Sequence, residues 1–385
     1  MHEQASAVDF DALLEAHGVS RRSFMKLCGA VAVAAGLGSA GIPKVAYALE
    51  DKIIGATEGK LYPAIWIEGA SCTGCTESFA QVDSPDAATV VLELLSLNYS
   101  ETLSAAAGFS MEEAKERTIK AGNDSLIYEG AILEGWGGNA LRVAGEPGTK
   151  HLIEAAEHAN AVVALGSCAV NGGWMGAEPN TSGAMGVQKF LDKNGIKTPV
   201  INIPGCPANP EWLVSVLVDV VMMGQLPELD SYNRPKGIFG QTIHDNCERR
   251  GHFENGEFVY EYGSKEEALG YCLYPLGCKG PQTHANCGVT QWNHGRSWCV
   301  KAGAPCIGCC EADPMNPSDN WVQVHTPFAA RLRDLRIGDL TFSPDVAAGA
   351  VTGVVAAALV AHGVGMKISG RMDGGAPFEK VRSWD

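Results

Sequence analysis

Three cysteine motifs in this chain share one local pattern, an apolar run followed by glycine and then by cysteine. The cysteines are Cys72 with Cys75, Cys168, and Cys206, which follow residues 62–67, 161–165 and 200–203 in that order. The carboxyl ends of parallel strands lie at one edge of a sheet, where doubly wound folds bind their ligands. We therefore expect four thiols that are distant in sequence to converge at one sheet edge.

The first half of the chain alternates short apolar runs with helical stretches, as parallel α/β folds do. The predicted strands cover residues 62–67, 90–97, 125–128, 161–165 and 200–203. The predicted helices cover residues 111–121, 150–158, 184–193 and 211–223. With 385 residues, the chain is long enough for two or three structural units.

Four converging thiolates can hold a 4Fe–4S cluster. A tetrahedral zinc site uses the same number of ligands and is the alternative. A single Cys-x-x-Cys motif would leave the question undecided, whereas three matching strand ends make coincidence a poor explanation. The pattern predicts a metal site and leaves the metal open.

The cysteine content is the unusual part of the composition, with 13 in total and 12 of them between Cys72 and Cys310. Such a density indicates metal binding in an intracellular protein and disulfides in an exported one. The remaining composition, 46% apolar and 19% charged, is that of an ordered globular protein. A net charge of −15 without a basic stripe argues against a nucleic-acid partner.

The N-terminus, over residues 1–48, resembles an export signal of the twin-arginine type. Arg21 and Arg22 precede a weakly apolar run at residues 27–42, and small residues at 45–48 form a cleavage pattern. The alternative is a chance pair of arginines before an ordinary helix. Proteins that use this route fold and take up cofactors before they cross the membrane, which favours metal over disulfides for the cysteines.

Residues 230–317 show little periodicity and are rich in Gly, Pro, Trp, Asn and Cys. Such a segment needs support other than an apolar core, and metal clusters provide it through their ligand bonds. One group of candidate ligands, which could also hold zinc, is His244, Cys247, Cys272 and Cys278. A second group is Cys287, Cys299, Cys306 and Cys309. Cys310 is interpreted as a spare thiol.

Residues 346–366 form a run of 21 without a formal charge, long enough to span a bilayer. Gly349 and Gly353 give it a small-residue face of the kind that packs membrane helices together. The alternative is a buried helix of the soluble part. Basic residues on both sides leave the orientation undecided, and export of the body would place the C-terminus in the cytoplasm. His362 is an ionisable group in this run, either functional or simply bonded to a neighbouring helix.

Taken in order, these motifs resemble those of the small subunits of nickel–iron hydrogenases. The matching motifs are Cys-Thr-Gly-Cys-Thr-Glu-Ser, Gly-Ser-Cys, Pro-Gly-Cys-Pro, His-x-x-Cys, Leu-Gly-Cys-Lys-Gly-Pro and Pro-Cys-Ile-Gly-Cys. They cover about residues 61–312. The resemblance extends to the N-terminal signal and to the C-terminal anchor.

The resemblance implies a flavodoxin-like domain over residues 49–228, with a proximal 4Fe–4S cluster on Cys72, Cys75, Cys168 and Cys206. It implies an irregular iron–sulfur domain over residues 229–317, with a distal 4Fe–4S cluster on His244, Cys247, Cys272 and Cys278. A medial cluster between these two would use Cys287, Cys306 and Cys309. A linker at 318–345, a transmembrane helix at 346–366 and a cytoplasmic tail at 367–385 complete the chain.

Two departures from the family pattern bear on the clusters. Many members have proline where Cys299 stands, and their medial cluster is 3Fe–4S. A fourth thiolate at Cys299 predicts a medial 4Fe–4S cluster, as in the selenium-containing branch, whereas a Cys299 that only packs leaves it 3Fe–4S. Oxygen-tolerant relatives carry two further cysteines where Gly74 and Gly173 stand here, so tolerance by that mechanism is not expected.

The resemblance implies a hydrogenase whose nickel–iron site lies on a separate large subunit, so that this chain holds no catalytic residue. Its implied role is to carry electrons from H2 through three clusters to a membrane cytochrome b or another quinone-linked subunit, with the body on the periplasmic side. Glu77 either faces the large subunit or is a solvated carboxylate at a helix start. The alternatives are an electron-relay subunit of a complex-I-like assembly and an exported zinc or disulfide scaffold.

Overall fold

The computed structural model describes residues 14, 20–34, 42–43, 46, 61–83, 85–122, 124–177, 179–222, 226–311, 335–337, 340–342 and 344–369. The chain forms two units, residues 1–326 and residues 327–385. Of the predicted segments, the end of the cleavage pattern at residues 47–48, most of the linker and the tail from residue 370 lie outside the described residues.

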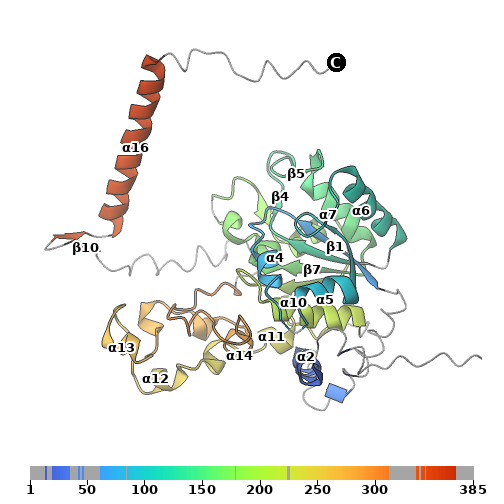
Figure 1. Ribbon diagram of the computed structural model, residues 1–385, viewed down its shortest axis with the longest axis horizontal. Helices are drawn as coiled ribbons and strands as arrows, with labels where there is room; N and C mark the ends of the chain where they lie inside the picture. Colours follow the sequence, from blue (N-terminus) through green and yellow to red (C-terminus); the bar gives the residue numbers. More distant parts are fainter. Residues whose placement is uncertain are drawn as a thin grey trace, which may run out of the picture. The chain divides into compact units, whose positions relative to one another are not determined.

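Five parallel strands form the central sheet of the first unit, in the order β2-β1-β3-β7-β9 (Figure 1). Their bounds are Tyr62–Glu68 for β1, Leu95–Ser100 for β2, Ser125–Glu129 for β3, Ala161–Leu165 for β7 and Val200–Ile203 for β9. This is the doubly wound order of flavodoxin-like folds. The predicted α/β fold class is confirmed.

Helices cover both faces of this sheet, which is why β3, β7 and β9 are buried at every position. One apolar cluster packs the sheet against helices that include α6 (Phe109–Ala121), α7 (Gly148–His158) and α9 (Val187–Lys193). A second cluster packs the other face against α4 (Gly74–Phe79), α5 (Ala87–Thr89) and α10 (Pro210–Leu217). The strand ends between the two helical layers are left free to carry loops.

Three predicted elements differ from the structure. Residues 90–97 were predicted as one strand, but Val90–Leu94 form a π-helix and β2 begins at Leu95. The predicted helix at 184–193 begins only at Val187, because Ala184–Met185 (β8) pairs with Ile132–Leu133 (β4). The predicted helix at 211–223 is α10 followed by a π-helical turn, Val218–Met222.

The remaining short elements of the sheet domain complete its surface. They are α8 (Gly166–Asn171), a 3₁₀ turn at Gly173–Gly176, and the hairpin strands β5 (Arg142–Val143) and β6 (Glu146–Pro147). An N-terminal helix, α2 (Arg21–Ala34), lies within the predicted signal segment and packs against α10 and α11. Its Phe24 and Cys28 are buried in the same apolar cluster as Trp212, while Arg21 and Arg22 are exposed.

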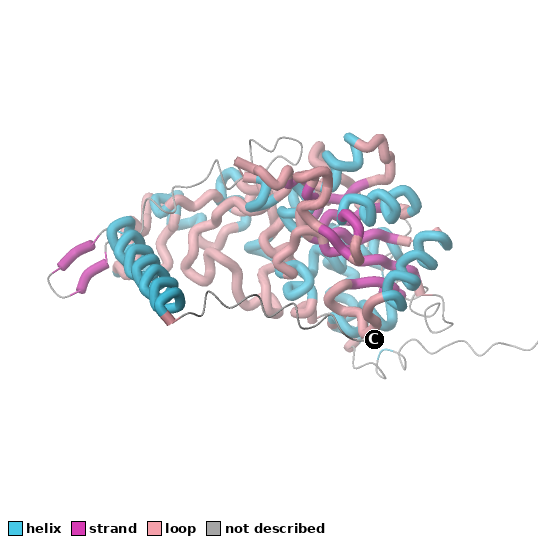
Figure 2. The backbone as a smooth tube through the Cα atoms, turned by 90° about the horizontal axis from the view of Figure 1, so that it is seen from above, coloured by secondary structure: helices cyan, strands magenta, loops and turns pink. Residues whose placement is uncertain are grey.

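The cysteine-rich region after the sheet is mostly loop (Figure 2). Its short helices are α11 (Lys236–Phe239), α12 (Arg250–Glu254), α13 (Lys265–Ala268) and α14 (Cys287–Thr290), with 3₁₀ turns at His244–Asn246, Tyr274–Leu276 and Gly280–Gln282. The region also shares the apolar cluster of α10. Trp212 stacks edge-on with Phe239 and Trp292, and its indole N–H donates to Asn286 at 2.6 Å. Apolar contact with α10 therefore supports this region in addition to any metal.

The second unit contains a short hairpin and one long helix. The hairpin pairs β10 (Leu335–Ile337) with β11 (Leu340–Phe342), and the helix is α16 (Pro344–Ile368). Within the described residues, α16 alone is long and apolar enough to cross a membrane. Its candidate span, Gly349–Ile368, has a mean hydropathy of 1.7. The predicted run at 346–366 thus lies within a helix.

Candidate metal centres

The strand ends of β1, β7 and β9 bring the first four predicted ligands together. Burial, followed by the neighbouring charges of Cys206 and Cys72, raises the pKa of the Cys168 thiol to about 12. Burial and then the charge of Glu129 raise the pKa of Cys75, with Cys168 and Cys206 adding to the effect. Each thiol thus lies within electrostatic reach of the others. The expected convergence at one sheet edge is what the fold produces.

Two glycines keep space open around these sulfurs. Gly166 has φ +84°, and a Cβ there would lie 2.5 Å from the Cys75 sulfur. Gly173 has φ +54°, and a Cβ there would lie 2.6 Å from the Cys168 sulfur. Both distances are far inside van der Waals contact, and both backbone conformations favour glycine. A side chain at either place would take the room beside the thiols.

A buried carboxylate holds the first cysteine motif in place through hydrogen bonds. Glu129 ends β3, is 2% exposed, and accepts four hydrogen bonds from the loop that carries Cys72 and Cys75. Its oxygens accept from the Ser71 hydroxyl (2.8 Å), the N–H of Cys75 (3.0 Å) and both the N–H (3.0 Å) and the hydroxyl (2.6 Å) of Thr76. This side chain therefore sets the conformation of the loop.

The second group lines a small cavity in the cysteine-rich region. His244, Cys247, Cys272 and Cys278 all border it. Burial raises the pKa of Cys247, with further contributions from the charges of Cys278 and Cys272. The His244 ring is oriented by an edge-on contact with Phe253, at 4.6 Å between ring centroids. The predicted set of one imidazole and three thiols is brought together.

The third group lies beside the first. Cys287 and Cys306 are buried, and burial followed by the charges of Cys309 and Cys287 raises the pKa of Cys299 to about 11. The charge of Cys299 thus interacts with those of Cys309 and Cys287 in its own group, and to a smaller extent with that of Cys278 in the second group. Cys310, predicted to be a spare thiol, is buried as well, with its sulfur 3.9 Å from that of Cys309.

The spacing of these donors separates two kinds of metal site. In a tetrahedral zinc site, four ligands share one ion, so their sulfurs stand within about 4 Å of one another. In a 4Fe–4S cluster each thiolate binds its own iron, so the sulfurs stand further apart. Across the described ranges, no group of three Cys, His, Asp or Glu residues has the spacing for a single ion. Thiols in sets of four, with one imidazole in the second set, are donors of the kind that hold iron–sulfur clusters.

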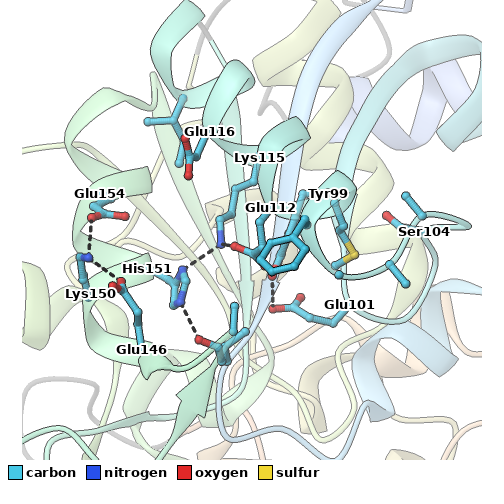
Figure 3. A pocket seen from close by; sticks show the side chains of 18 of the residues that line it. Tyr99, Glu101, Ser104, Glu112, Lys115, Glu116, Glu146, Lys150, His151 and Glu154 are labelled. Carbon is cyan, nitrogen blue, oxygen red and sulfur yellow. Dashed lines mark hydrogen bonds and ion pairs between the residues drawn. The ribbon is translucent and has the colours of Figure 1, made fainter. Parts of the chain in front are cut away.

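A cavity of about 1120 Å³ lies elsewhere, between α6 and α7 (Figure 3). The Nζ of buried Lys115 forms an ion pair with Glu112 and lies 2.8 Å from Nδ1 of His151. Nε2 of that ring faces the Val143 carbonyl oxygen at 3.0 Å, so Nε2 carries the proton and Nδ1 accepts. Burial raises the pKa of nearby Glu101 to about 7. These polar groups satisfy one another, and no predicted ligand lines the cavity.

Comparison with known proteins identifies the family. Residues 239–321 match the family model for the C-terminal part of the NiFe/NiFeSe hydrogenase small subunit, and residues 72–220 match "NADH ubiquinone oxidoreductase, 20 Kd subunit". The hydrogenase-2 small chain of Escherichia coli K12 is 42% identical over 302 residues, 78% of each chain. The chain belongs to the small subunits of nickel–iron hydrogenases. It is therefore part of a hydrogenase heterodimer, and its family carries iron–sulfur clusters.

Two further relatives agree with this assignment. The periplasmic [NiFe] hydrogenase small subunit of Solidesulfovibrio fructosivorans is 42% identical, over 79% of this chain and 93% of its own. The solved structure of a recombinant [NiFeSe] hydrogenase from Desulfovibrio vulgaris Hildenborough superposes with a TM-score of 0.62 and 34% identity, over 70% of this chain and 98% of that one. The complex-I-like alternative accounts for the sheet domain alone, because the second family model covers only residues 72–220.

Several residues that contact the candidate ligands were not predicted from the sequence. Glu129 supports the first motif, and Ser167 bonds to the loop of Cys309. The side chain of Trp174 lowers the pKa of Cys206 and its backbone lowers that of Cys168, which partly offsets the rise that burial causes in both. A signal existed for two of them, since Glu129 ends β3 and Ser167 follows β7 closely, whereas Trp174 lies beyond α8. Glu77 is exposed in the first turn of α4, and His362 is exposed on α16, so their roles stay predictions.

Proposed function

We propose that this chain is the electron-transfer subunit of a membrane-bound hydrogenase and carries three 4Fe–4S clusters. The proximal cluster would be held by Cys72, Cys75, Cys168 and Cys206. The distal cluster would be held by His244, Cys247, Cys272 and Cys278. The medial cluster would be held by Cys287, Cys299, Cys306 and Cys309. The proposal rests on one observation. The twelve candidate ligands lie in three sets of four within the first unit.

The position of Cys299 supports four ligands at the medial site. Its thiol interacts electrostatically with Cys309 and Cys287, as a fourth ligand of that group would. Proline at this place would leave three thiolates. The structural match to a [NiFeSe] hydrogenase is in keeping with the resemblance to the selenium-containing branch.

When bound, iron–sulfur clusters supply reversible one-electron chemistry. The chain's own residues would hold and tune them. Backbone N–H groups of Arg249 and Gly308 donate to the sulfurs of Cys247 and Cys306, each at 3.4 Å. Hydrogen bonds to cluster sulfurs are one of the levers that set the potential. Two cysteines of the medial group, Cys287 and Cys306, are buried, whereas Cys299 is exposed.

We further propose export through the twin-arginine route and anchoring by α16. The exposed pair Arg21 and Arg22 at the start of α2 supports the first, and the length and hydropathy of Gly349–Ile368 support the second. Related proteins include a periplasmic hydrogenase subunit. With its body outside the membrane, the chain would pass electrons from H2 to a membrane cytochrome b or another quinone-linked subunit, which would dock near His244.

Anaerobic purification of the heterodimer, followed by iron and sulfide analysis, tests the cluster assignment. We expect a brown protein with four irons for each of three clusters, whose visible absorbance bleaches under H2. Cys272→Ser should lose the distal cluster, whereas Ser215→Ala, a change at a buried residue of α10 outside the three sets, should keep the full iron content. A colourless, zinc-loaded protein would refute the proposal.

A further inference from the structure

The proximal and medial groups meet at one serine. Ser167 stands between Gly166 and Cys168 at the end of β7, and 2% of it is exposed. Its hydroxyl accepts from the N–H of Gly205 at 3.0 Å and donates to the carbonyl oxygen of Cys309. Its own N–H donates to the Gly205 carbonyl at 2.9 Å. One side chain therefore joins the end of β7, the loop after β9 and the medial loop.

Through this serine, hydrogen bonds join the two groups. The N–H of Gly205, which precedes the proximal residue Cys206, donates to the Ser167 hydroxyl, and that hydroxyl donates to the carbonyl oxygen of the medial residue Cys309. The charges of the Cys206 and Cys309 thiols also interact. A path of covalent bonds and two hydrogen bonds thus runs from the Cys206 backbone through Gly205 and the Ser167 hydroxyl to Cys309.

Contacts just beyond Cys309 hold the medial loop in the same place. The Cys310 thiol donates to the Pro204 carbonyl at 3.5 Å, and Nη1 of Arg234 donates to the Cys310 carbonyl at 3.0 Å. Arg234 is 5% exposed, and its Nε donates to Asp230 at 2.8 Å. Because residues 309 and 310 are both anchored, the medial loop is held against the ends of β7 and β9.

We propose that Ser167 is a positioning residue for electron transfer between the proximal and medial groups. It acts by holding the Gly205 N–H and the Cys309 carbonyl oxygen on one hydroxyl. The proposal rests on the proposed function, because it needs a cluster at each group. The rate of electron tunnelling falls less steeply with distance through covalent and hydrogen bonds than across gaps. A loosened hydrogen bond between the two groups therefore slows electron transfer. One electron moves from the proximal group to the medial group. H2 oxidation on the large subunit supplies that electron.

The test compares Ser167→Ala with wild type in the intact heterodimer. Changes to residues that support metal ligands typically cost about 10–100-fold, so we expect reduction of the medial cluster after mixing with H2 to slow by about 10-fold. Stopped-flow absorbance and freeze-quench electron paramagnetic resonance (EPR) measure it. Iron content should be unchanged. Exchange between H2 and D2O should also keep its rate, because it needs no electron to leave the large subunit.

Two control variants separate positioning from general destabilisation. Ser167→Thr keeps the hydroxyl and should reduce its medial cluster at the wild-type rate. Ser215→Ala removes an equally buried hydroxyl, 6% exposed and bonded to the Glu211 carbonyl at 2.8 Å in α10, and should have no effect. If Ser167→Ala takes up less iron than wild type, Ser167→Cys, similar in size but a weak donor, should show the slowing instead.

An unchanged medial reduction rate in the variant that loads all its iron overturns the inference. Equal slowing of isotope exchange also overturns it, because the defect would then lie before electrons leave the large subunit. A wild-type heterodimer without iron at the proximal or medial group refutes the proposed function instead. That result is read from the wild type before any variant is compared.

Discussion

Replacing Glu129 by glutamine should loosen the proximal group without changing any cysteine. The carboxylate accepts two hydrogen bonds on each oxygen, from Ser71 and Cys75 on one and from Thr76 twice on the other. Glutamine keeps one oxygen and turns an NH2 group toward two of these donors. Two hydrogen bonds to a charged acceptor are therefore lost, and two buried donors are left facing another donor.

Each hydrogen bond to a charged group is worth about 1.5–3 kcal/mol, so the local cost of Glu129→Gln is roughly 3–6 kcal/mol. This cost falls on the loop that carries Cys72 and Cys75. Loss of such support typically weakens metal binding by about 10–100-fold. We expect iron release from the proximal site to a chelator to accelerate by about that factor.

The assay follows iron release and the proximal EPR signal in the purified heterodimer under anaerobic conditions. Glu116→Gln is the matched control, because Glu116 only pairs with Lys120 on the surface of α6, at 3.0 Å, and such pairs contribute at most about 1 kcal/mol. Equal iron release from the two variants would refute the reasoning.

Three other changes have defined outcomes. Cys299→Pro should convert the medial cluster to 3Fe–4S, seen as a new EPR signal in the oxidised protein; a wild-type spectrum would show that Cys299 is not a ligand. Burial raises the pKa of Asp219 to about 7 from 3.8, so the folded state binds more protons than the unfolded state between these values and stability falls as pH rises. Asp219→Asn should remove the part of this slope that Asp219 contributes and, by about 1.4 kcal/mol per pH unit, gain on the order of 4 kcal/mol at pH 8. The thermal midpoint should then drop less between pH 5 and pH 8 than that of wild type, and an equal drop would contradict it. Truncation before Pro344 should move the heterodimer from the membrane to the soluble fraction with the same iron content, and retention in the membrane would count against α16 as the anchor.

The sheet was predictable because its strands are buried on both faces. The strands at 161–165 and 200–203 have the predicted bounds, and those at 62–67 and 125–128 extend by one residue. The error at residues 90–97 has a physical cause, since a short apolar run does not distinguish a strand from a buried helical turn. The helix expected from residue 184 starts late because Gly186 precedes it and β8 uses Ala184–Met185 in a pair.

The ligand groups were predictable to the extent that strand ends place cysteines at one edge. Their supports were not, because each depends on pairing between distant segments. Glu129 reaches the first motif only because β3 pairs in register with β1, Glu129 opposite Glu68. Ser167 reaches Cys309 across 142 residues of sequence. Local patterns carry no information on such contacts, although an acidic residue that ends a fully buried strand is a useful signal.

The central claim is that this hydrogenase subunit holds three 4Fe–4S clusters on the twelve ligands named above. Mössbauer spectroscopy of the intact, ⁵⁷Fe-enriched heterodimer tests it most directly, because each cluster type has its own signature in a known oxidation state. The account predicts that all iron on this subunit belongs to 4Fe–4S clusters, one of them with a histidine-ligated iron. A stoichiometric 3Fe–4S component, or a protein with fewer than three clusters, would contradict it.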